Sequence, residues 1–107
     1  MKVVDPMRAV LEAVAAMPTR PATAAIHDAP AARLVVFRIE PGQEVAPHTN
    51  TGTVLLTVLS GTGSIMGGTE WREVGPGAVV AYAPDEPHAM KAGAQRFCVM
   101  ATIVRAT

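Results

Sequence analysis

Two histidines and one asparagine are the side chains of this sequence best suited to chemistry. His48 and Asn50 lie two positions apart in a stretch bounded by turns, and His88 follows a second such stretch. Because residues two apart on a strand face the same way, we expect His48 and Asn50 to share one face. Imidazole is a good ligand for Zn, Ni, Fe or Cu, whereas an amide oxygen is a weak one. A neutral imidazole also offers one donor and one acceptor, so the same residues could bind a small molecule instead.

The segments around these residues predict a mostly β protein. In 33–40 the apolar residues follow the period of two that is typical of strands, and 53–59 forms an apolar β segment. Residues 53–59 are apolar on both faces, with Val54, Leu56 and Val58 on one and Leu55 and Leu59 on the other. Such a strand needs a core on one side and a helix or a second subunit on the other. We expect further strands near 24–27 and over 64–66, 69–74, 78–83, 88–92 and 96–105.

One helix is predicted before the strands, over residues 5–17. Asp5 is a suitable N-cap, Pro6 fits the first helical position, and Pro18 ends the pattern. An apolar stripe follows at helical spacing and must pack on the protein's own sheet or on a partner; it contains Met7, Val10, Leu11, Val14 and Met17.

Residues 41–63 resemble the first motif of the cupin family. Gly42 begins the motif and His48 follows after five residues, as the family pattern requires. Asn50 occupies the position of the second histidine, and Gly61 closes the motif. Val54 stands where the family has its glutamate, which puts the usual metal site in doubt.

Residues 75–88 resemble the second cupin motif, with Gly77, a strand over 78–82, a turn and then His88. Ala83 stands where the family usually has proline, and Ala92 where it has asparagine. Asp85 replaces a turn glycine, which is tolerable because aspartate accepts left-handed geometry. The resemblance covers residues 33–105 and implies a small jelly-roll barrel within a single domain, 1–107, that is commonly dimeric.

The resemblance also implies that His48, Asn50 and His88 converge inside the barrel, often around a metal ion. Tyr82 could add a hydroxyl if the register of its strand turns it inward. Without a glutamate at position 54, no negative charge offsets a dication. Glu44 could swing inward to replace it, although a glutamate just after a Pro-Gly turn is more typically solvated. If a metal binds, we expect one divalent transition ion: Zn, Ni, Fe, Mn or Cu.

Three functions remain open at this point. The first is a stand-alone cupin that binds a small molecule or a divalent metal ion inside the barrel, with no reaction assigned. The second is a metal-dependent enzyme of oxygenase or isomerase type that uses His48 and His88. The third is a non-catalytic homodimeric domain with a structural or regulatory role. The missing glutamate argues against the second function and the retained histidines argue against the third.

Composition excludes several other classes of protein. Nine basic residues balance nine acidic ones with no basic stripe, which gives no electrostatic reason to expect nucleic acid or an anionic membrane as a partner. Cys98 is the only cysteine, so no intrachain disulfide can form, and its apolar surroundings predict a buried, inert thiol. His27 is expected at the surface. With no signal-peptide pattern, a cytoplasmic location is expected.

Overall fold

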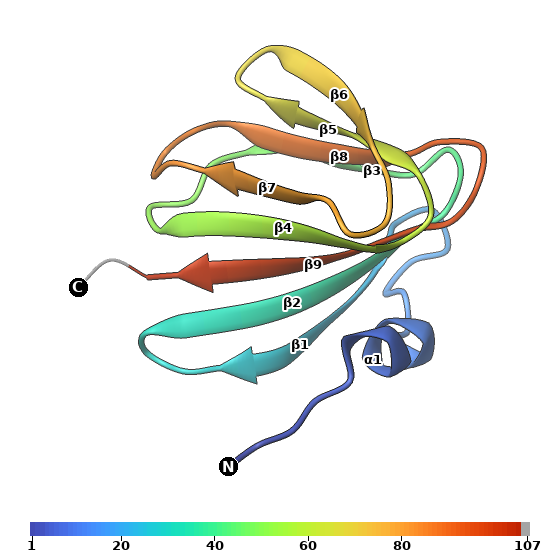
Figure 1. The fold of residues 1–107 in the computed structure, drawn as a ribbon. Coiled ribbons are helices and arrows are strands. Elements are labelled where there is room, and N and C mark those ends of the chain that lie inside the picture. The colour runs from blue at the N-terminus through green and yellow to red at the C-terminus, as the bar shows by residue number, and fades with distance from the viewer. Residues whose placement is uncertain (106–107) are drawn as a thin grey trace.

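The computed structural model describes residues 1–105 as two facing antiparallel sheets and one N-terminal helix, α1 (Pro6–Glu12) (Figure 1). The five-stranded sheet runs in the order β1 (Ala22–Asp28), β2 (Ala32–Ile39), β9 (Phe97–Val104), β4 (Thr53–Ser60) and β7 (Val79–Tyr82). The four-stranded sheet runs in the order β3 (Glu44–His48), β8 (His88–Ala92), β5 (Gly63–Gly67) and β6 (Glu70–Val74).

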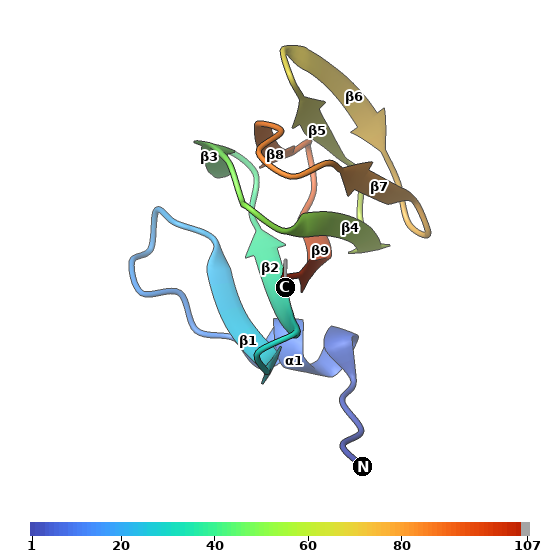
Figure 2. The same ribbon diagram turned by 90° about the vertical axis from the view of Figure 1, so that its left-hand side faces the viewer.

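The all-β prediction is confirmed, but the expected closed barrel needs correction. Within residues 1–105, no strand of one sheet pairs with a strand of the other, so the molecule is an open sandwich of two layers (Figure 2). The edge strands β6 and β7 lie on either side of a cavity instead of pairing with each other. No helix in this described part of the chain is long and apolar enough to cross a membrane.

The main core lies between the two sheets. The predicted inner face of 53–59 is confirmed, because Val54, Leu56 and Val58 are all buried there. Alternate residues of the neighbouring strand β9 join them, including Phe97 and Val99, as the pleat of a strand requires. With only four aromatic residues in the chain, aliphatic side chains form most of this core.

The outer face of the five-stranded sheet is covered in part by α1. Val10 of the helix is fully buried against Val36 and Cys98, and Leu59 packs at the edge of the same cluster. The expected burial of Cys98 is therefore confirmed. The helix cluster covers Leu59 at one end of the second apolar face of β4, whereas Leu55 on the same face lies outside that cluster.

The helix is shorter than the predicted 5–17. Asp5 caps its start, as expected, by accepting a hydrogen bond from the Arg8 amide, but the helix ends at Glu12. The Arg38 guanidinium binds the carbonyls of Val10, Leu11 and Ala13, which have no partner within the helix. The chain then extends toward Pro18, leaving Val14 and Met17 of the predicted stripe exposed.

Gly61, which closes the first motif, sits in a tight turn after β4. Its φ is +76°, a conformation that favours glycine, and a Cβ there would collide with the backbone carbonyl of Arg96. The glycine therefore lets the segment before β9 pack directly against the end of β4. Asp85, the residue predicted to accept left-handed geometry, does so with φ +64°.

Candidate functional site

His48 and His88 face each other from adjacent strands. His48 ends β3 and pairs in register with His88 at the start of β8, after an irregularity in the ladder between Val45 and His48. The two ring centroids lie 4.1 Å apart, with an angle of 63° between the ring planes. The structure therefore brings together the two imidazoles that the motifs predict.

Backbone carbonyls determine which nitrogen of each ring carries the proton. His48 Nδ1 lies 2.9 Å from the carbonyl oxygen of Ala46, and His88 Nδ1 lies 3.1 Å from that of Glu86. Because a carbonyl oxygen can only accept, each Nδ1 must be the donor. In the neutral imidazole this leaves Nε2 with a free lone pair, which is the usual arrangement of a metal-binding histidine.

The environment of His88 favours its neutral form. Burial lowers the pKa of this imidazole below its usual value, in part opposed by the hydrogen bond to the Glu86 carbonyl. The neighbouring His48 lowers the pKa further, against a smaller opposing effect of the Glu86 carboxylate. The residue is only 4% exposed. A neutral imidazole can bind a metal ion, whereas a protonated one cannot.

Both histidines border a small cavity of about 50 Å³ inside the sandwich. Val54, which replaces the family's glutamate, is buried in its wall. Among the residues lining this cavity none is acidic or basic apart from the histidines; the full lining is Phe37, His48, Asn50, Val54, Leu56, His88, Met90, Ala101 and Ile103. A space of this size admits an ion with one or two waters and excludes most organic ligands.

Asn50 lines the cavity but does not lie on a strand. It follows the end of β3, so the alternation used to orient it from the sequence does not apply. Its Oδ1 accepts a hydrogen bond from the Gly52 amide at 2.8 Å, and its backbone carbonyl accepts one from the Asp85 amide. The side-chain oxygen thus supports a turn in this structure.

Tyr82 points inward, but its hydroxyl is already engaged. It donates to the Met66 carbonyl at 2.8 Å, and its ring lies 4.9 Å from that of His88. Burial, with a smaller contribution from the Glu86 carboxylate, raises the pKa of Tyr82 to about 12, so the phenol stays neutral. Tyr82 therefore packs beside the His88 ring without lining the small cavity.

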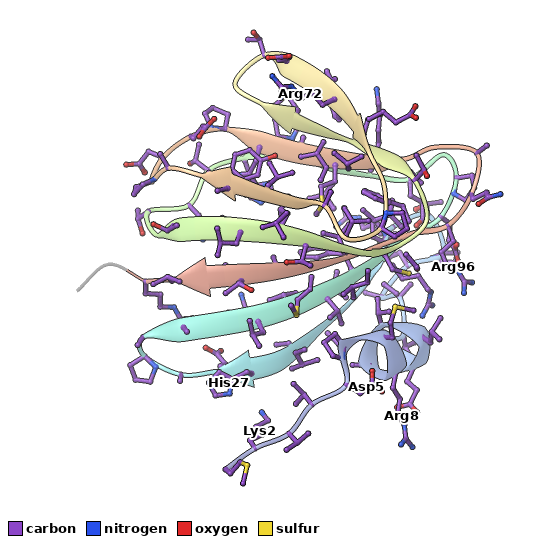
Figure 3. The ribbon with its side chains drawn as sticks, in the orientation of Figure 1. Lys2, Asp5, Arg8, His27, Arg72 and Arg96 are labelled. Atoms are coloured by element: carbon purple, nitrogen blue, oxygen red, sulfur yellow. The ribbon has the colours of Figure 1, made fainter. Side chains whose placement is uncertain are left out.

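The remaining candidates lie outside this site. Glu44 is exposed at the start of β3, and His27 lies on β1, distant from both motifs (Figure 3). Among residues 1–105 no group of three or more His, Cys, Asp or Glu side chains is placed to hold a metal ion.

A second and larger cavity, which the sequence did not predict, opens between the edge strands β6 and β7. Its volume is about 500 Å³, and Tyr82 separates it from the histidine pair. The lining combines an apolar floor with Glu70, Arg72 and Glu86. Because residues two apart on a strand share a face, the sequence could have shown that Glu70, Arg72 and Val74 of β6 lie on the same side. That alternation was the one signal in the sequence for this cavity wall.

The two sheets, with the buried His88 and the exposed His48 bordering one cavity, define a jelly-roll protein of the cupin type. A comparison with protein families matches residues 35–104 to the Cupin domain family. The chain therefore belongs to this family, as the two motifs predicted.

Solved structures support the same assignment. An RmlC-like cupin protein from Desulfovibrio desulfuricans is 28% identical, with a TM-score of 0.81 over 97% of this chain and 96% of the other. A conserved protein of unknown function from Streptococcus pyogenes is 24% identical, with a TM-score of 0.79 over 99% of this chain and 89% of the other. The second comparison shows the fold alone. A search of curated proteins finds no match.

Proposed function

We propose that this cupin binds one transition-metal ion through Nε2 of His48 and Nε2 of His88. The observation that carries the proposal is the anchoring of both Nδ1 atoms by backbone carbonyls, which commits both Nε2 lone pairs to accepting or ligating. The small volume of the cavity that both rings border agrees with an ion as the occupant. Two protein imidazoles would leave coordination positions open for water or a small molecule.

The direct test is the metal content of protein purified without a histidine tag or a chelating column. We expect the wild type to retain near-stoichiometric metal after incubation and desalting, and His48→Ala and His88→Ala each to lose it. His27→Ala is the matched control, because His27 lies on β1 outside the site. Equal metal content in all four proteins would contradict the proposal, as would metal-free wild type after exposure to Zn, Ni, Fe, Mn and Cu.

A second candidate function is the binding of an organic molecule in the cavity between β6 and β7. Its volume favours this, since pockets for small ligands occupy about 300–1,000 Å³. Gly67 borders the cavity, and a Cβ at this position would meet Tyr82 and Glu86 at ordinary contact distance. Gly67→Val should therefore fold yet narrow the cavity. A ligand found by screening should lose affinity in Gly67→Val but keep it in His48→Ala; the reverse pattern would place it at the histidine pair.

A further inference from the structure

The donor set around the histidine pair is neutral, and one of its members is a sulfur atom. Met90 lies two residues after His88 on β8, lines the same cavity and is only 1% exposed. Two other buried sulfurs lie elsewhere: Cys98 belongs to the separate cluster beneath α1, and Met66 does not line this cavity. The cavity thus offers two imidazole nitrogens and one thioether, with Val54 in place of a carboxylate.

Electrostatics disfavours a dication in such a cavity. The cost of moving an ion from water into apolar surroundings rises with the square of its charge, so a dication costs about four times as much as a monocation. The walls supply no anion in compensation. The nearest carboxylate that acts on His88 is that of Glu86, which borders the neighbouring cavity beyond Tyr82.

Ligand softness points in the same direction. Zinc prefers four ligands, commonly with thiolate or carboxylate among them, whereas thioether sulfur is a soft donor that selects Cu(I). A leucine at position 90 would fill the core equally well, so what methionine adds is its polarizable sulfur. Building on the metal site proposed above, we infer that Met90 is a third protein ligand and that the site selects Cu(I) over Zn(II).

The test compares two metals and two methionine variants. Purified protein is titrated with Cu(I) under anaerobic conditions in competition with a chromophoric Cu(I) chelator, and separately with Zn(II). We expect wild type to bind Cu(I) more tightly, and Met90→Leu to weaken Cu(I) binding by about tenfold or more while changing Zn(II) affinity by less than about twofold. Met66→Leu is the control, because Met66 is also a buried methionine but does not line the cavity.

X-ray absorption at the copper edge provides a readout of the ligands themselves. We expect a sulfur neighbour in wild type that is absent in Met90→Leu. Leucine and methionine have similar volumes, so both variants should fold, and a thermal unfolding curve verifies this. Zn(II) binding through the histidines that equals or exceeds Cu(I) binding would overturn the inference yet leave the proposed metal site standing. Unchanged Cu(I) binding in Met90→Leu would also overturn the inference and leave the metal site standing. If neither metal binds the wild type, both the inference and the proposed metal site are overturned.

Discussion

His88 combines burial with a titratable group, and this makes the folded protein sensitive to mild acid. Its pKa is lowered below the ordinary value of 6.5, chiefly by burial, so the unfolded chain binds a proton more readily than the folded one. Stability from this residue is fully present above about pH 6.5 and is lost as the pH falls from there through the lowered pKa. The metal-free protein should therefore become less stable well before its carboxylates titrate.

We expect the urea midpoint of the metal-free wild type to fall between about pH 7.5 and about pH 5.5, because protonation of His88 favours unfolding. His88→Gln should show a smaller decrease over the same interval. His27→Gln controls for the loss of a histidine elsewhere and should behave as the wild type does. An unchanged pH dependence in His88→Gln would show that another group is responsible.

For single residues, the sequence predicted which side chains lie close together better than it predicted what each side chain binds. The spacing of the motifs singled out His48 and His88, and the fold brings their rings together. It could not assign Asn50, whose side chain supports a turn, or the Tyr82 hydroxyl, which donates to the Met66 carbonyl. Each of these hydrogen bonds joins a side chain to a backbone group that folding brings close, so the order of side chains in the sequence does not reveal it. Nor does the sequence pattern place Met90 beside the histidines, because that proximity depends on which residues share a cavity.

Among the elements, α1 depends on a residue of the sheet for its C-terminal end. Arg38 Nη1 lies 2.7 Å from the Val10 carbonyl and 2.9 Å from that of Ala13. These groups are partly buried, so water cannot fully replace the guanidinium. The sequence predicted the start of the helix from Asp5 and Pro6, but its end was missed because the contact spans 25 to 28 residues of the chain.

We expect Arg38→Met to lower the free energy of unfolding by about 1–3 kcal/mol, since it keeps the aliphatic stem but leaves the helix carbonyls unpaired. Arg8→Met is the control, because Arg8 is 77% exposed and pairs only with Glu12 on the helix surface. The control should change stability by less than about 0.5 kcal/mol. Urea unfolding measures both variants, and equal effects would contradict the proposed role of Arg38.

For the whole molecule, the expectation of a homodimer remains a prediction. Part of the outer face of the five-stranded sheet lies beyond α1, where Leu34, Thr102, Leu55 and Ala81 follow one another across β2, β9, β4 and β7. Leu55 is half-buried on this face, away from the main core. A second subunit could cover this row.

Sedimentation velocity should show a dimer for the wild type and a monomer for Leu55→Lys, because a lysine there would have to be buried in the interface without a partner. Trp71→Lys, on a strand of the four-stranded sheet, is the control and should remain dimeric. A monomeric wild type at high concentration, or a dimeric Leu55→Lys, would contradict the prediction.

The position of β9 also has a consequence for how the protein is made. This strand comes after all the others in the chain, yet it lies in the middle of the five-stranded sheet, between β2 and β4. A nascent chain translated only as far as residue 96 has β2 and β4 but lacks β9, the strand that pairs with both. The apolar faces of β2 and β4 then stay open to water and to other chains until the ribosome releases β9. Folding of this cupin domain therefore waits until β9 has left the ribosome, and the strands made before it are exposed to aggregation until that moment.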